Sequence, residues 1–257
     1  MCEAIASGLV KQSRFDYIII SEPFEPRRAY LKQKFPKVEI TNSNSDVISR
    51  SDVVVIAVKP QQLEDAFRGI MIKTNPLFIS ICAGVTLDKL QHSISSAARI
   101  ARVMPNFPAM IGAGACGFCL NAKCSDSDSV CVESVFTSVG AVVEKVSENL
   151  IDVVTGVSGS GPAYVCMFIE ALADAGVKHG LSRETALRLA AQTCVGTGQL
   201  VLGGGDSNHP AVIKDKVCSP GGTSIAAVVA LEQSGFRAAV FSGVTAAVDR
   251  SRDLGKM

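Results

Sequence analysis

Hydrophobic positions change their spacing once along the chain. Before about residue 147, short runs rich in Val and Ile alternate with segments in which apolar residues recur every three or four positions, as in amphipathic helices. After residue 150 the helical spacing continues and the strand-like runs stop. We therefore predict an α/β domain over residues 1–148, followed by an all-helical domain over residues 149–257.

The run Val53–Val58 is apolar on both faces, which is typical of a central strand in a parallel sheet that helices cover on both sides. Further strands are predicted over residues 16–20, 38–41, 78–81, 99–104, 114–120 and 141–146. Helices are predicted over residues 1–11, 28–35, 45–49 and 126–139 and over most of the chain from residue 163. The segment 105–108 contains two prolines and is expected to be non-helical. This order of elements predicts a Rossmann-like N-terminal domain.

The composition excludes several classes of protein. The 257 residues can bury a large core, and the formal net charge of +1 leaves no basic excess to attract nucleic acid or an anionic membrane surface. The apolar runs are far shorter than the ~20 residues of a membrane span, and the opening Met1-Cys2-Glu3 does not resemble a signal peptide. We expect a cytoplasmic protein that acts on a small molecule and binds neither nucleic acid nor membranes.

Nine cysteines are spread along the chain, and one pair has the spacing Cys116-Gly-Phe-Cys119. A zinc ribbon needs a second pair of this kind, which is missing, and both residues lie in an apolar, strand-like run. The three histidines share no spacing of a metal site. We expect reduced cysteines that act as small core residues, and no metal.

The first predicted strand ends in a segment that bears on the choice of cofactor. A carboxylate at this point of a Rossmann fold binds the ribose of NAD, whereas a small hydroxyl with nearby arginines suits the extra phosphate of NADP. Ser21 and Pro23 fit the second pattern. Arg27 and Arg28 fit it too, unless they only begin the next helix as solvated charges, whereas Glu22 fits the first pattern. We expect NADPH, with NADH possible.

Ligands of open α/β sheets bind outside the carboxyl ends of the strands. The candidates at the end of the long apolar run are Ala57, Val58, Lys59 and Pro60. Asn44 follows the strand predicted over residues 38–41 and is a candidate for the adenosine side of the cofactor. Cys82 and Ala83 follow the strand at 78–81, where small residues would let a nicotinamide ring approach the backbone. No nearby residue would lower the pKa of Cys82, so we do not expect a nucleophile there.

The segment Ser219-Pro220-Gly221-Gly222-Thr223-Ser224 precedes a run of good helix formers and predicts a helix N-terminus. The first N–H groups of a helix lack intrahelical partners, and the two glycines leave room for a small carboxylate to reach them. Taken alone, such a segment is more often only a capped helix after a loop.

This segment resembles the signature of the pyrroline-5-carboxylate reductases. Other segments resemble further blocks of the family, in the same order and at similar spacing. They are Ala57–Pro60, Cys82–Thr86, Met104–Pro108 and Val157–Tyr164. The resemblance implies NAD(P)H-dependent reduction of 1-pyrroline-5-carboxylate, a cyclic imino acid, to L-proline in the last step of proline biosynthesis.

The resemblance also implies roles for single residues. The substrate carboxylate would lie on the N–H groups of Gly222 and Thr223, which the positive end of the helix dipole favours. Ser224 falls where the family usually has a threonine that faces the substrate nitrogen, so it is the expected catalytic donor. Ser219 would position the loop, and Gly221 would leave room for the substrate.

Two alternatives to this activity remain open. A reductase of a related cyclic imine, such as the six-membered analogue, would use the same two-domain scheme. A catalytically silent subunit would only assemble. The helices after residue 150 are poor in charge and rich in Ala, Gly and Val, so we expect a homodimer or a higher homo-oligomer, as in the family, whose C-terminal helices interlock.

The start of the chain differs from the family pattern. There, the helix predicted over residues 1–11 follows a strand and a Gly-rich dinucleotide loop, and Met1 aligns just past the last glycine of that loop. Without that strand, the strands at 16–20 and 53–58 either pair directly, across a gap of ~9.5 Å, or leave backbone groups unpaired. We expect this chain to keep the reductase architecture and to bind NADPH weakly.

Overall fold

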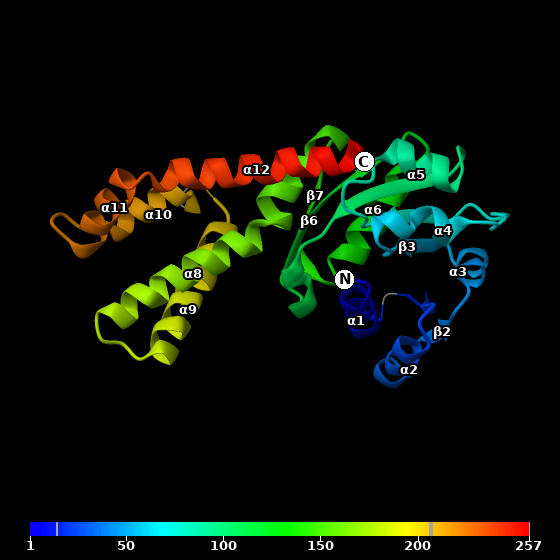
Figure 1. The fold of residues 1–257 in the computed structure, drawn as a ribbon, viewed down its shortest axis with the longest axis horizontal. Helices are drawn as coiled ribbons and strands as arrows, with labels where there is room; N and C mark the ends of the chain where they lie inside the picture. The colour runs from blue at the N-terminus through cyan, green and yellow to red at the C-terminus, as the bar shows by residue number, and fades with distance from the viewer. Residues whose placement is uncertain (14, 206–207, 257) are drawn as a thin grey trace. The chain divides into compact units, whose positions relative to one another are not determined.

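The computed structural model describes residues 1–13, 15–205 and 208–256 (Figure 1). The chain divides into two compact units. The first comprises Met1–Ser160 together with Ala247–Met257, and the second comprises Gly161–Ala246. The division lies after residue 160, whereas the sequence predicts a domain boundary at residue 148, and that boundary stays a prediction. At its C-terminal end the chain returns to the first unit.

The described strands of the first unit form two sheets. In the smaller sheet, β1 (Ile19–Ser21) pairs in parallel with β2 (Glu39–Thr41). The larger sheet has the order β3-β4-β5-β6-β7, in which β5 and β6 are antiparallel and the other pairs are parallel. Its strands are β3 (Val53–Ile56), β4 (Leu77–Ser80), β5 (Arg99–Met104), β6 (Gly114–Leu120) and β7 (Gly140–Lys145). These bounds confirm the predicted strands to within a few residues.

The prediction of a central position for the run 53–58 is wrong for the described part of the chain, because β3 lies at the end of its sheet. Both faces of β3 are nevertheless covered by helices. Val54 and Ile56 belong to one buried cluster, and Val53 and Val55 pack against another. Burial of both faces therefore does not require pairing of both edges, and β1 and β3 belong to separate sheets instead of pairing directly.

Helices flank these strands. In chain order they are α1 (Cys2–Gln12), α2 (Glu25–Lys34), α3 (Asn44–Arg50), α4 (Leu63–Phe67), α5 (Leu87–Ile94), α6 (Asp126–Phe136) and α7 (Ile151–Val154). The short helical turns are η1 (Pro60–Gln62), η2 (Phe107–Ile111), η3 (Glu148–Leu150) and η4 (Thr155–Gly159). Ser43 and Thr86 cap α3 and α5, because each hydroxyl accepts a hydrogen bond from the backbone N–H three residues later in the chain. The expectation of a non-helical 105–108 is wrong for Phe107 and Pro108, which begin η2, and a proline is tolerated in such a first turn.

The second unit is helical. It contains α8 (Gly161–Lys178), α9 (Arg183–Leu202), α10 (Pro210–Val217), α11 (Thr223–Gln233) and the first part of α12 (Phe236–Lys256). Ser182 caps α9, since its hydroxyl accepts a hydrogen bond from Thr185 N at 3.2 Å. The sequence did not predict α10. Among the described helices, none is by itself long and apolar enough to cross a membrane, although α11 and α12 together pass that test as a pair bent by 55°.

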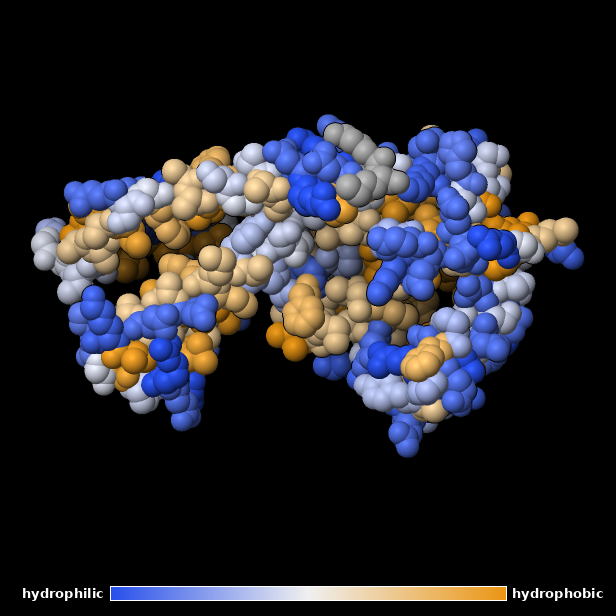
Figure 2. Space-filling model, in the orientation of Figure 1, coloured by the Kyte–Doolittle hydropathy of each residue, from blue (hydrophilic) through white to orange (hydrophobic). Residues whose placement is uncertain are grey.

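The second unit has a very small core of its own. Ala173, Ala186 and Ala190 are its buried cluster, between α8 and α9, which lie side by side. Larger apolar side chains stay exposed, including Met167 at 69% and Phe241 at 75%. Figure 2 shows apolar surface over the helices of this unit.

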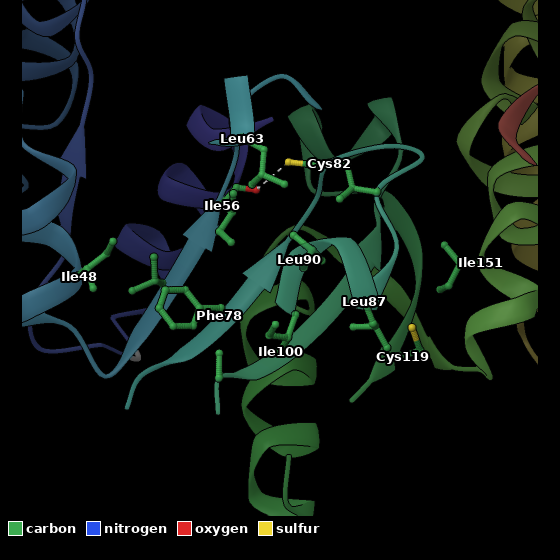
Figure 3. Packing of buried hydrophobic residues seen from close by; sticks show 13 residues of the cluster. Ile48, Ile56, Leu63, Phe78, Cys82, Leu87, Leu90, Ile100, Cys119 and Ile151 are labelled. Atoms are coloured by element: carbon green, nitrogen blue, oxygen red, sulfur yellow. Dashed lines mark hydrogen bonds between the residues drawn. The ribbon is translucent and has the colours of Figure 1, made fainter. Parts of the chain in front are cut away.

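Two of the buried clusters of the first unit lie on opposite faces of the larger sheet. Phe78, Ile100 and Cys119 point to one face, where they meet α5 and α7 (Figure 3). Ile79 and Phe118 point to the other face, where they meet α1 and α6. Alternation along the strands separates the two sets.

Helix α1 joins the two sheets. Ala6 packs with Ile20 of β1 and Leu31 of α2 in the buried cluster of the smaller sheet. Ile5, the adjacent residue, packs with Leu77 in the cluster of the larger sheet. The position of β1 relative to β3 therefore depends on this helix and on α3, which contacts β1 and packs Ile48 against Val54.

One edge of β3 faces no strand in the described residues. The carbonyls of Asp52 and Ile56 accept hydrogen bonds from Leu77 N, in β4, and from Ile81 N, directly after β4. In a parallel pair the intervening residues point their backbone groups to the opposite edge, so Val53 and Val55 present their N–H groups there.

We predict that the amides of Val53 and Val55 exchange hydrogen at least about tenfold faster than those of Ile79 and Ala101, which face a neighbouring strand. Hydrogen exchange followed by NMR measures all four in one sample. Equal protection of the four amides would mean that the edge of β3 is covered.

Candidate functional site

The carboxyl ends of β3 and β4 meet at one edge of the larger sheet, because these strands are parallel. The predicted cofactor residues Ala57–Pro60 follow β3, and Cys82 and Ala83 follow β4. A hydrogen bond from Cys82 Sγ to the carbonyl oxygen of Val58, 3.3 Å long, joins the two turns. The structure therefore brings these predicted residues together.

Within this group the side chains differ in exposure. Lys59 and Ala83 are exposed, whereas Cys82 is buried. Burial raises the pKa of the Cys82 thiol, which keeps it protonated at neutral pH. A thiol of this kind donates hydrogen bonds and is a poor nucleophile, in agreement with the sequence-based expectation.

Ser21 ends β1, and its hydroxyl oxygen is buried without a hydrogen-bond partner among the described residues. The next residue, Glu22, is tied into its own loop. Its N–H donates to Thr41 O at 3.0 Å, and its carboxylate accepts from Phe24 N at 2.9 Å. An unpaired buried hydroxyl is costly, so Ser21 marks a place where a ligand group would find a partner.

The two arginines proposed to bind the extra phosphate of NADP have partners within the protein. Arg27 forms an ion pair with Glu3, and Arg28 donates to the carbonyl oxygens of Glu22 at 3.0 Å and Pro23 at 2.6 Å. Hydrogen bonds, first of all from Lys34, lower the pKa of Glu3 to about 2, so its carboxylate is charged at neutral pH. The preference for NADPH through Arg27 and Arg28 therefore stays a prediction.

Asn44 is the first residue of α3 rather than a strand end. Its side-chain amide donates to Ala66 O at 3.0 Å, which connects α3 to α4. The residue predicted for the adenosine side thus also holds two helices together.

Cys116 and Cys119 lie three positions apart on β6 and belong to the clusters on opposite faces of the sheet. Burial raises the pKa of Cys116 to about 12 and that of Cys119 to about 11. Side chains on opposite faces cannot share a metal ion or form a disulfide. No group of metal-binding side chains was found in the described ranges.

The predicted substrate segment forms a tight turn that leads into α11. Gly222 N donates to Ser219 O at 3.0 Å, with Pro220 and Gly221 between them. The φ of Gly221 is 68°, as a type II turn requires at this position. The N–H of Gly222 is therefore already used within the turn, contrary to the expectation that it would bind the substrate carboxylate.

The amino end of α11 is open. Gly222 is the N-cap residue and provides no side-chain cap, so the N–H groups of Thr223 and Ser224 have no intrahelical partner. A side chain at position 222 would also collide with the Ser219 hydroxyl. The turn thus presents backbone donors and the Ser224 hydroxyl at a positive helix end, which suits a small carboxylate.

The predicted cofactor residues belong to the first unit, and the predicted substrate residues belong to the second. Sequence reasoning missed one polar group of the first unit. Arg102 is buried at 5% exposure and lies near the carboxylates of Glu148 and Asp152. These residues are at least 46 positions from Arg102, so no local pattern could reveal the group.

Comparison with known proteins supports a family assignment. The family model described as pyrroline-5-carboxylate reductase dimerisation matches residues 148–254, and the model described as NADP oxidoreductase coenzyme F420-dependent matches residues 1–84. The pyrroline-5-carboxylate reductase of Synechocystis sp. is 46% identical over all of this chain and 95% of its own, and that of Escherichia coli is 39% identical with the same coverage.

Solved structures agree with these relatives. The structure of a pyrroline-5-carboxylate reductase from Coxiella burnetii has a TM-score of 0.92 and 33% identity, and the match covers 100% of this chain and 95% of that one. The Plasmodium falciparum pyrroline carboxylate reductase with NADP bound has a TM-score of 0.84 and 33% identity over 98% of this chain and 94% of that one. Full-length similarity in both sequence and fold shows that the chain belongs to the pyrroline-5-carboxylate reductase family.

Proposed function

We propose that this chain reduces 1-pyrroline-5-carboxylate to L-proline with the substrate carboxylate bound at the amino end of α11. The observation that carries the proposal is the uncapped start of α11 behind the tight turn Ser219–Gly222. The first free donors are the N–H groups of Thr223 and Ser224, since Gly222 N is paired with Ser219 O. The helix dipole adds a favourable charge at this end.

The hydroxyl of Ser224 is the proposed donor to the imine nitrogen. Reduction of a C=N bond adds a hydride to carbon and a proton to nitrogen, so a donor beside the nitrogen stabilises the charge that develops there. Ser224 is half-buried and lies in the first turn of α11, next to the proposed carboxylate site. One turn of helix therefore would orient both ends of the substrate.

The nicotinamide cofactor supplies the hydride when bound. The residues proposed to hold it are Ser21 and Pro23 after β1, Asn44 in α3, Ala57–Pro60 after β3, and Cys82 and Ala83 after β4. The unpaired buried hydroxyl of Ser21 and the small, exposed residue Ala83 fit such a ligand. We propose NADPH as the preferred cofactor, and Glu22, whose carboxylate lies in the same loop, as the group that would favour NADH.

We expect NADPH oxidation when 1-pyrroline-5-carboxylate is added, and slower oxidation with NADH. Absorbance at the nicotinamide band measures both, with the six-membered cyclic imine as a parallel substrate. Turnover of only the six-membered imine would assign the chain to the related reaction. Turnover of neither would support the silent subunit, and a clear preference for NADH would point to Glu22.

Ser224→Ala is expected to lower kcat at least about tenfold, equivalent to about 1.4 kcal/mol of lost transition-state stabilisation. Ser224→Thr keeps the hydroxyl and should retain activity. Ser234→Ala is the matched control, because it removes a hydroxyl at the other end of α11 that donates to Ala230 O within the same helix. Unchanged kinetics in Ser224→Ala would remove this residue from the site.

We further propose that the oligomer is at least a homodimer formed through the second unit. An apolar groove of about 390 Å³ lies on α11 and α12. Its apolar lining consists of Val228, Leu231, Phe236, Val240 and Phe241. Among the described residues of this unit the buried cluster consists of three alanines, so the apolar surface of the groove exceeds what its own core covers, and a second copy would cover it.

Light scattering should give at least twice the 26.9 kDa chain mass at micromolar concentration. Phe241→Asp places a charge on the groove and is expected to lower the measured mass. Met71→Asp is the control, because Met71 is exposed to a similar degree, 77%, on the first unit. A monomer mass for the unmodified chain would contradict the proposal.

A further inference from the structure

The buried group around Arg102 has no role in the reaction proposed above. Arg102 lies in β5, and its guanidinium is 3.4 Å from Glu148 Oε1 and 3.5 Å from Asp152 Oδ1. Its side chain is only 6% exposed. One buried cation between two carboxylates is expensive to assemble, and both carboxylates also bind other parts of the chain.

Each carboxylate of this group binds one further element. Glu148 Oε1 accepts a hydrogen bond from Leu87 N at 2.7 Å, at the start of α5. Asp152 Oδ1 accepts one from the hydroxyl of Ser251 at 2.7 Å, near the end of α12. Ser251 is itself buried, at 6% exposure. We call Arg102, Glu148, Asp152 and Ser251 the Arg102 cluster.

The end of α12 packs on the turn that follows β4. A Cβ at Gly255 would lie 3.0 Å from Gly84 O, and a Cβ at Gly84 would lie 3.4 Å from Gly255 N and from Leu254. The backbones are thus in direct contact, and Ser251 lies one helical turn before this contact. The bond between Ser251 and Asp152 therefore fixes how far the end of α12 reaches over Gly84.

The segment 82–87 is consequently held at two points. Glu148 holds Leu87 at its end, and α12, anchored by Ser251, covers Gly84 in its middle. Cys82 and Ala83, which are proposed to contact the cofactor, lie between the end of β4 and Gly84. Arg102 lies between the two carboxylates and couples the two anchors.

We propose that the Arg102 cluster consists of positioning residues that set the conformation of the turn Cys82–Gly84 and thereby the affinity for the nicotinamide cofactor. The inference rests on the proposed cofactor site. Loss of one partner leaves a buried charge with fewer contacts, and the side chains and helix end around it shift to compensate. The shift reaches Ala83 through Gly84, while the start of α11, in the other unit, keeps its own turn.

The test uses the full chain and measures NADPH affinity directly, by fluorescence titration, beside steady-state kinetics and thermal unfolding. In Ser251→Ala and Asp152→Asn we expect the Kd for NADPH to rise at least about fivefold. The KM for 1-pyrroline-5-carboxylate at saturating NADPH should change less than about twofold. Arg250→Ala, which truncates an exposed side chain on the same turn of α12, is the control and should bind NADPH normally.

A second pair of variants probes the contact itself. Gly255→Ala adds a methyl group against Gly84 O and should weaken NADPH binding in the same way. Gly243→Ala makes the same change on the same helix, where the added methyl group meets no described atom beyond its own stretch of helix, and should leave NADPH binding unchanged. Light scattering on both variants verifies that the oligomer is intact.

The possible outcomes separate the two proposals. A lower unfolding temperature with an unchanged Kd for NADPH in Ser251→Ala, Asp152→Asn and Gly255→Ala would show a merely structural cluster and overturn this inference alone. Equal rises in the KM values for imine and cofactor would overturn it as well. Absence of NADPH binding by the unmodified chain would overturn the proposed cofactor site and this inference with it.

Discussion

Both faces of the parallel strands β3, β4 and β5 have to be buried, and this requirement determines the arrangement of the first unit. Helices α1 and α6 cover one face, and α5 and α7 cover the other. Chain segments that cross from one parallel strand to the next bring all carboxyl ends to the same edge. The turns after β3 and β4 therefore meet, and the bond from Cys82 to Val58 O connects them. The place of the cofactor residues is a consequence of how the sheet is covered.

Local signals in the sequence predicted most of this arrangement. The strands at 99–104 and 114–120 were predicted with the bounds that the structure has, and Pro105 and Gly114 mark the end of the first and the start of the second. The start of α11 was predicted from the two glycines and the hydroxyl residues after them. The position of β3 at the end of its sheet was not, because an apolar pattern reports which faces are buried and carries no information about which edges are paired.

Interactions between distant residues could not be predicted. The ion pair between Arg27 and Glu3 joins two helices. It gives a partner within the protein to an arginine that the sequence suggested for binding a phosphate. The contacts of Arg102 with Glu148 and Asp152 likewise depend on the packed fold. Such pairs depend on geometry that only the assembled sheet and its helices provide, and a charged residue looks the same in the sequence whether it is buried or solvated.

The turn before α11 also constrains how this sequence can change. A Cβ at position 222 would meet the hydroxyl of Ser219 closer than real side chains approach each other, and the carbonyl oxygen of Ser219 is only 3.1 Å away. Any larger residue at position 222 therefore requires the Ser219 hydroxyl to turn away and the turn to open slightly. Substitutions at positions 219 and 222 are consequently coupled, and their effects on stability should not add.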